Sequence, residues 1–216
     1  MHKSINNLIS VKKELEIKSH NQNVEIIAVS KTFPINEILP LIEYGHHHFG
    51  ENKVQEAINK WGELKNNNKN IKLHLIGKLQ SNKAKDAVKI FDYIHSLDNI
   101  KLANKIAVEQ KKINKNIKLF IQINIGNEVQ KNGLRPEELK KFYNQCVNDF
   151  NLNIVGLMCI PPQTGNMRDY FNKMLELKNL VRLKDLSMGM SNDYLEAANC
   201  GASFLRIGSK IFGERN

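Results

Sequence analysis

Eight short apolar runs, separated by longer segments of helical periodicity, constrain the fold of this chain more than any other feature. Runs bounded by polar, Gly or Pro residues are typical of buried strands, and each intervening segment is long enough for a helix. Eight strands alternating with helices in 216 residues predict an α/β fold, a single closed (β/α)8 TIM barrel. A doubly wound sheet is the main alternative, but it usually has fewer strands. The expected strands cover residues 24–30, 47–50, 72–76, 93–96, 119–125, 154–158, 186–188 and 204–207.

The helical segments begin with an extra amphipathic helix, at about residues 5–16, that precedes the barrel. The next helix follows Pro34, with Asn36 as a possible N-cap, and ends at Gly45. Composition does not change along the chain, so residues 1–216 are expected to form one domain. The other helices are expected at about residues 53–64, 82–90, 100–111, 136–149, 167–181 and 192–199.

Composition also bounds the location of the protein. No stretch approaches the roughly 18 to 20 consecutive apolar residues of a membrane span, and the first residues lack the apolar core of a secretory signal. A cytoplasmic protein without membrane contact is therefore expected. Cys146, Cys159 and Cys200 are widely spaced and odd in number, which predicts reduced thiols and neither a disulfide framework nor a zinc site.

The net charge of +10, with a pI of about 9.4, raises the question of a nucleic-acid partner. The sequence has only five arginines, however, and its lysines are spread along the chain. Proteins that read bases or phosphates usually rely on Arg side chains and interleaved aromatic residues. We therefore expect no nucleic-acid partner, and interpret the excess of Lys and Asn as a bias acting on solvated positions.

Lys31 directly follows the first apolar run and precedes Thr32, Phe33 and Pro34. A buried strand would thus deliver one amine to its carboxyl end, the end at which barrels of this type carry their active sites. An amine partly removed from water is more often neutral, and a neutral amine can form a Schiff base. An ordinary solvated lysine just past a strand is the alternative.

The loops after the seventh and eighth strands are short, polar and rich in Gly and Ser. In TIM barrels these loops frequently bind phosphate. Gly189 and Gly208 would let the backbone approach an anion, Ser191 and Ser209 can donate hydroxyl hydrogen bonds, and the helix near Asn192 can direct its amides to the same group. Two tight turns with no ligand remain the alternative.

Arg206 lies near the end of the eighth strand, which barrel closure places beside the first strand and Lys31. One amine, one phosphate site and one cation around a pocket of aromatic-ring size is the arrangement expected for pyridoxal 5′-phosphate. The amine would hold the aldehyde, and Arg206 would face the pyridine nitrogen.

Six motifs in the same order extend this interpretation to essentially the whole chain. With them the sequence resembles the pyridoxal phosphate homeostasis protein family (YggS/PROSC/PLPBP), which is related to the barrel domain of alanine racemase, a pyridoxal phosphate protein of fold type III. The motifs are Ala28–Thr32, Phe49–Glu56, His74–Lys83, Gly156–Met158, Leu186–Ser191 and Arg206–Gly213.

The resemblance implies that Lys31 carries pyridoxal phosphate covalently as an internal aldimine and that Arg206 faces the pyridine nitrogen. It further implies that Ser191, Gly208 and Ser209 hold the phosphate, and that Asn52 lines the pocket. His74 and Met158 end strands and either pack near the cofactor or belong to the core.

The sequence departs from the usual family pattern at two places. The run from His46 to His48 precedes Phe49 where apolar residues are usual, and Lys78 replaces a frequent Pro. Neighbouring strand residues alternate between faces, so three consecutive His cannot all bind one metal ion. No metal site is therefore expected.

The resemblance implies a protein that holds pyridoxal phosphate reversibly for homeostasis and delivery to apo-enzymes, without catalytic activity of its own. A racemase needs a second acid/base, which alanine racemase takes from an additional domain across a dimer interface. The sequence ends at Asn216, so we expect neither that domain nor that dimer, and predict a monomer. A racemase or related enzyme, with water or Tyr170 as the second group, is the alternative.

Overall fold

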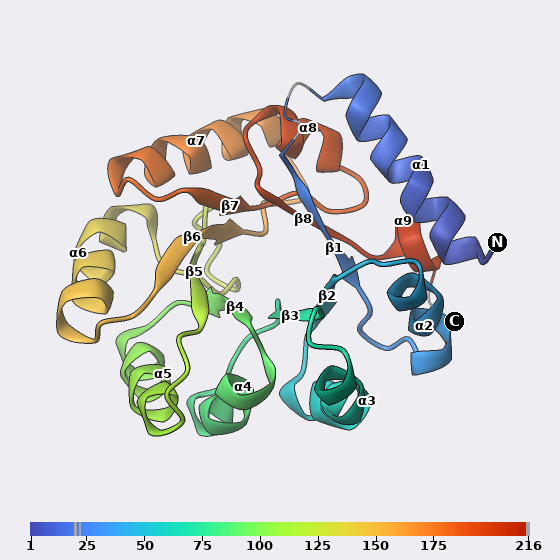
Figure 1. Cartoon of the computed structure of the whole chain (residues 1–216). Coiled ribbons are helices and arrows are strands. Elements are labelled where there is room, and N and C mark those ends of the chain that lie inside the picture. Colours follow the sequence, from blue (N-terminus) through green and yellow to red (C-terminus); the bar gives the residue numbers. More distant parts are fainter. Residues whose placement is uncertain (20, 22, 215–216) are drawn as a thin grey trace.

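The computed structural model describes residues 1–19, 21 and 23–214, and its centre is a closed barrel of eight parallel strands, paired in sequence order (Figure 1). Helices surround the barrel, so the predicted (β/α)8 architecture is confirmed. The strands are β1 (Glu25–Val29), β2 (His48–Glu51), β3 (Lys72–Leu75), β4 (Tyr93–Leu97), β5 (Lys118–Ile123), β6 (Ile154–Cys159), β7 (Asp185–Ser187) and β8 (Phe204–Ile207).

The helices form the outer layer, and α1 packs outside the barrel against α2, α8 and α9. Their apolar faces cover the outward-facing strand residues, as the helical spacing of apolar positions predicts. The α-helices are α1 (Lys3–Lys18), α2 (Ile35–Glu43), α3 (Val54–Asn67), α4 (Ala84–Ile90), α5 (Ile100–Lys112), α6 (Leu139–Asn144), α7 (Met167–Leu180), α8 (Tyr194–Asn199) and α9 (Ser209–Phe212).

Pairing of β1 with β8 closes the barrel and sets the geometry of the ligand end. Ile27 pairs with Arg206, and Ala28 pairs with Ile207. Because both strands run parallel, the residue that follows β1 lies close to the end of β8. Lys31 and Arg206 are therefore neighbours across this seam, although 175 positions separate them in the sequence.

The barrel interior is mixed in character. Its apolar part is a buried cluster of one residue from each of five strands: Ile27, Tyr93, Phe120, Met158 and Phe204. Other strand residues add buried polar side chains, among them His74 of β3, His95 of β4 and Ser187 of β7. Polar groups in such a core must be hydrogen-bonded to be tolerated.

One prediction about the helices is wrong, and two others differ from the structure in detail. Asn36 does not cap α2, because the N-cap position is Pro34 and no side chain caps this helix. The last helix before β8 ends at Asn199 as predicted, and it begins at Tyr194, two residues after the expected start. The helical segment expected at residues 136–149 has these bounds, but it consists of a 3₁₀ turn η2 (Pro136–Glu138), the short α6, and a π-helical turn η3 (Gln145–Asp149).

Two predictions about composition can be compared with the described residues. Cys146, Cys159 and Cys200 are buried free thiols, as expected. Burial raises the pKa of Cys159 to about 12, so this thiol stays protonated near neutral pH. Within the described parts of the chain, no helix combines the length and apolar character needed to cross a membrane.

Candidate functional site

A cavity of about 320 Å³ opens at the carboxyl ends of the strands. Three of its lining residues are cationic, Lys31, Lys78 and Arg206, and none is Asp or Glu. Such a charge balance favours an anionic ligand. The lining residues are Val29, Lys31, Phe33, Asn52, Ile76, Gly77, Lys78, Gln122, Asn132, Ile160, Met190, Ser191, Arg206, Gly208, Ser209 and Gly213.

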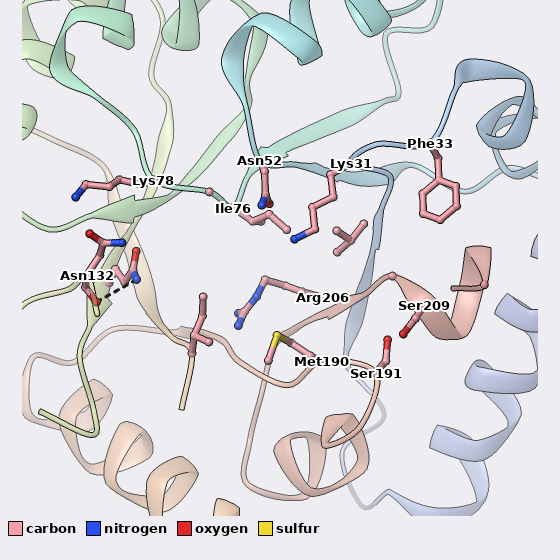
Figure 2. A pocket seen from close by; sticks show the side chains of 16 residues that line it. Lys31, Phe33, Asn52, Ile76, Lys78, Asn132, Met190, Ser191, Arg206 and Ser209 are labelled. Atoms are coloured by element: carbon pink, nitrogen blue, oxygen red, sulfur yellow. Dashed lines mark hydrogen bonds between the residues drawn. The ribbon is translucent and has the colours of Figure 1, made fainter. Parts of the chain in front are cut away.

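Lys31 is half-buried in the turn that follows β1, and its side chain points across the cavity toward Arg206 (Figure 2). The turn is tight: Thr32 has a φ of 69°, in the left-handed region, and the Phe33 amide donates to the Ser30 carbonyl at 3.1 Å. The Thr32 amide also donates to Glu56 on α3, at 2.7 Å. The backbone on both sides of Lys31 is therefore fixed.

A buried ionic network lies behind this turn. Oε1 of Glu51, at the end of β2, accepts from Ser30 Oγ at 2.7 Å and from Lys60 Nζ at 3.0 Å. The Trp61 indole donates to the same oxygen at 3.0 Å. Lys60 also donates to the Ser30 carbonyl at 2.9 Å, which ties α3 to the residue just before Lys31.

Arg206 is 4% exposed and is oriented by two hydrogen bonds. It donates from Nη1 to Ser187 Oγ at 2.8 Å and from Nη2 to the Cys159 carbonyl at 2.7 Å. Burial lowers the pKa of the guanidinium, but an arginine remains charged under these conditions. A guanidinium has five N–H donors, so these two bonds leave donors for a ligand in the cavity.

The loops after β7 and β8 bring Ser191 and Ser209 to the same end of the cavity (Figure 2). The Lys210 amide donates to Ser191 Oγ at 3.4 Å, which joins the two loops. Gly208 precedes α9, a short helix that the sequence did not predict. The three atoms nearest to a Cβ on Gly208 would all belong to Val29, the closest at 3.5 Å, which is ordinary van der Waals contact, so packing does not demand glycine there.

Gly189, which we expected to approach the anion, does not line the cavity. Its φ is +89°, and a Cβ at this position would lie 2.5 Å from Ala197 Cβ and 2.9 Å from Leu205. Glycine is therefore required here by the turn and by packing against α8 and β8. The anion role predicted for Gly189 is wrong.

Asn52 directly follows β2 and lies beside Lys31 in the cavity wall (Figure 2). The backbone of Gly77, after β3, approaches it so closely that a Cβ on Gly77 would be 2.3 Å from the Asn52 carbonyl oxygen. The absence of a side chain at Gly77 thus allows the ends of β2 and β3 to meet at the cavity.

All six residues predicted for the site line this one cavity: Lys31, Asn52, Ser191, Arg206, Gly208 and Ser209. Sequence reasoning missed the opposite end, where Gln122 donates to the Asn132 carbonyl at 3.3 Å beside Lys78. Gln122 lies near the end of β5, Asn132 lies in the loop after the same strand, and Lys78 follows β3. The polar side chains of Gln122 and Lys78 near strand ends were the available signal. Lys78 had been noted only as a departure from the family pattern.

Three other residues considered in the sequence lie outside the lining. Met158 packs in the apolar cluster of the barrel interior, and His74 is fully buried below the cavity. Tyr170, the possible second base of a racemase, lies on α7, where its hydroxyl donates to the Thr164 carbonyl at 3.4 Å.

The three consecutive histidines face different surroundings. His46 is buried against Phe49 and its Nε2 contacts the His48 carbonyl at 2.9 Å, while His47 is exposed and His48 turns into the barrel. Among the described residues, no group of three or more His, Cys, Asp or Glu side chains is placed to hold a metal ion.

Comparison with known proteins agrees with this geometry. The family model of the alanine racemase N-terminal domain matches residues 12–216. A pyridoxal phosphate homeostasis protein of Haemophilus influenzae is 40% identical over 97% of this chain and 94% of its own length. The chain belongs to the pyridoxal phosphate homeostasis protein family.

Solved structures of similar proteins have the same fold. PipY of Synechococcus elongatus PCC7942, solved without pyridoxal phosphate, superposes with a TM-score of 0.88 at 35% identity, covering 98% of this chain and all of that one. The structure of PipY with pyridoxal phosphate bound gives 0.85 at 34% identity, over 97% of this chain and all of that one.

Proposed function

We propose that this protein binds pyridoxal 5′-phosphate reversibly, as a Schiff base with Lys31, and serves in its cellular homeostasis and delivery without catalytic activity of its own. The observation that carries the proposal is the convergence of Lys31, Arg206 and the two serine-bearing loops on one cavity without acidic side chains. The binding of pyridoxal phosphate in the PipY structure supports the same assignment.

The residues present fit this ligand at each of its polar ends. A phosphate suits Ser191, Ser209 and the Gly208 backbone, because a missing Cβ at Gly208 leaves space that packing does not need. A pyridine nitrogen suits the donors of Arg206, and an aldehyde suits the amine of Lys31, which faces Arg206 in Figure 2. The cationic lining matches the negative charge of the ligand.

The protein's contribution is to bind and orient. Pyridoxal phosphate, when bound, supplies an aldehyde for the amine and a ring that withdraws electrons most strongly when its nitrogen is protonated. Arg206 can only donate hydrogen bonds, so it favours an unprotonated ring nitrogen and weakens this property. Lys31 serves a single face of the ligand, whereas racemisation requires an acid/base on both faces. These features favour holding the ligand over transforming amino acids.

The proposal includes a cytoplasmic monomer that passes pyridoxal phosphate to apo-enzymes. The monomer is proposed because Lys31, Arg206 and both serine-bearing loops already meet within a single barrel. Delivery itself rests on the family and not on particular residues of this chain. Light scattering coupled to size exclusion tests the oligomeric state, and transfer to a defined apo-enzyme tests delivery.

Borohydride trapping tests the covalent site. Protein loaded with pyridoxal phosphate should show a yellow absorbance band, and reduction should leave one adduct, mapped by mass spectrometry to Lys31. Lys31→Ala should lose both signals, whereas Lys85→Ala, which removes an exposed lysine of α4, should keep them. The absence of band and adduct in the unaltered protein would refute the proposal.

Exchange of the α-hydrogen with deuterated solvent, over a panel of amino acids, tests the absence of catalysis. We expect no exchange above that of free pyridoxal phosphate. Exchange at enzymatic rates that disappears in Lys31→Ala would establish the racemase alternative.

A further inference from the structure

A row of side chains, all buried except the part-buried His48, connects Arg206 to the opposite end of the barrel. His48 Nδ1 lies 2.9 Å from His74 Nε2, and His74 Nδ1 lies 2.9 Å from His95 Nε2. His95 Nδ1 lies 2.9 Å from Ser187 Oγ, which accepts the 2.8 Å bond from Arg206. We call His48, His74, His95 and Ser187 the histidine network. This network gives His48 a structural role that could not be assigned from the sequence.

The two ends of the histidine network differ in chemistry. At the cavity it meets Arg206, a donor without acceptor atoms. At the amino ends of the strands, His48 Nε2 lies 3.8 Å from a carboxylate oxygen of the exposed Glu25. A carboxylate at neutral pH only accepts. The network is therefore hydrogen-bonded to a donor, Arg206, at the cavity, and at its other end it faces an acceptor, Glu25, at a distance longer than a direct hydrogen bond.

Both ends of the network favour the same direction of donation, from Ser187 through His95 and His74 to His48. Ser187 Oγ accepts from Arg206 and can direct its own hydrogen to His95 Nδ1. A neutral His95 then carries its proton on Nε2 and donates to His74, which donates in the same way to His48. His48 is left with its Nε2–H toward Glu25.

Burial keeps the three rings neutral. It lowers the pKa of His74 and His95 well below the usual value, and the charge of Arg206 lowers that of His95 further. Burial also lowers the pKa of His48, against the attraction of Glu25 and with the repulsion of His47, Lys72 and Lys118.

Stacking holds the ring planes independently of the hydrogen bonds. The His95 ring stacks on Phe120 with centroids 4.3 Å apart and planes at 16°. The His74 ring stacks on Tyr93 at 4.2 Å and 11°. An aromatic replacement of His95 can therefore keep the packing while it removes the hydrogen bonds.

We propose that Ser187 and His95 are positioning residues for Arg206, and that His74, His48 and Glu25 fix the direction of their hydrogen bonds. With the hydroxyl hydrogen of Ser187 directed at His95, the histidine network offers no donor to the ligand, and Arg206 alone faces the ring nitrogen. The part that concerns the ligand rests on the proposed function. The direction of the network does not.

Nitrogen-15 NMR of the ligand-free protein, labelled at histidine, tests the direction. We expect neutral Nε2–H tautomers for His48, His74 and His95 at pH 7, assigned through single His→Gln variants. An Nδ1–H tautomer or a charged ring at His95 would overturn the proposal. This measurement needs no pyridoxal phosphate, so it stands even if the proposed function fails.

Binding of two ligands tests the positioning. The probes are pyridoxal phosphate and its analogue with CH in place of the ring nitrogen. His95→Phe should weaken the binding of pyridoxal phosphate about tenfold, because Arg206 is then no longer oriented through Ser187 and its hydrogen bond to the ring nitrogen is lost. The affinity of the analogue, which lacks this nitrogen, should be almost unchanged. His95→Gln, which can donate and accept, should restore part of the difference, and His47→Phe should have no effect.

The result that contradicts the positioning is equal weakening of both ligands, since that indicates a general loss of structure. Ser187→Ala provides a second variant if His95→Phe does not fold. Failure of the unaltered protein to bind either ligand would instead refute the proposed function.

Discussion

At the scale of single residues, the site depends on polar groups that few other positions of a barrel would tolerate. Glu51 is fully buried, yet its carboxylate is held by Lys60, Trp61 and Ser30 next to the turn that carries Lys31. A buried charge of this kind is tolerated only while its partner remains. The stability of this end of the barrel and the placement of Lys31 are thus linked.

Removing the positive partner should show this link. Lys60→Met leaves the Glu51 carboxylate buried without its cation, and should lower the free energy of unfolding by about 3–5 kcal/mol. Adding Glu51→Gln in the same chain should recover part of the loss, because the buried charge is gone. Urea unfolding measures both, with exposed Lys83→Met as the control. A double variant no more stable than Lys60→Met would contradict the explanation.

The phosphate end of the site offers a second residue-scale prediction. Replacing both Ser191 and Ser209 with Ala should weaken retention of pyridoxal phosphate, because each lost charge-assisted hydrogen bond costs roughly 1.5–3 kcal/mol. Equilibrium dialysis measures the change, and Ser10→Ala on the exposed side of α1 is the control. Unchanged retention of pyridoxal phosphate in the double variant would show that these serines do not hold the phosphate.

At the scale of elements, the strands were predictable because their apolar runs are short, regular and bounded by polar residues. The helix α9 was not, because its four residues, Ser209–Phe212, are too few to show a period. The division of residues 136–149 was also missed, because its apolar spacing suits a continuous helix while its backbone bonds shift to a 3₁₀ turn and a π turn.

The loops after β7 and β8 give opposite expectations for two glycines. Gly189→Ala should destabilise the fold by about 1–3 kcal/mol, because the new Cβ meets Ala197 at a backbone conformation unsuited to alanine. Gly208→Ala should leave the unfolding free energy nearly unchanged and weaken pyridoxal phosphate binding. Thermal unfolding and ligand titration of both variants measure this contrast. Equal destabilisation by the two changes would show that Gly208 also serves packing.

At the scale of the whole molecule, barrel closure is what turns scattered residues into a site. The sequence placed Lys31, Asn52, Arg206 and the serine loops at strand ends, and the fold brings them to one cavity. The end formed by Gln122 and Asn132 was not predicted, because it depends on how the long loop after β5 folds back over the barrel. The histidine network required knowledge of which strand residues face inward at the same level.

The buried histidines also predict how the stability of the whole molecule depends on pH. Burial lowers the pKa of His46 from 6.5 to about 4, with a smaller effect of Lys12, and lowers those of His74 and His95 well below 6.5. In the unfolded chain these rings bind protons near pH 6.5, whereas in the folded protein they remain neutral. The unfolded state therefore binds more protons as the pH falls, and stability decreases from about pH 6.5 downward.

For His46 alone the loss between pH 6.5 and pH 4 amounts to about 3 kcal/mol. Urea unfolding at pH 7, 6 and 5 should show this decrease above the range in which carboxylates are protonated. His46→Leu should flatten the slope, because one titrating group is removed, whereas His47→Leu at the exposed neighbouring position should not. Stability that is constant from pH 7 to pH 5 would mean that these rings titrate with the same pKa in the folded and the unfolded protein, which would contradict the lowered pKa values of His46, His74 and His95.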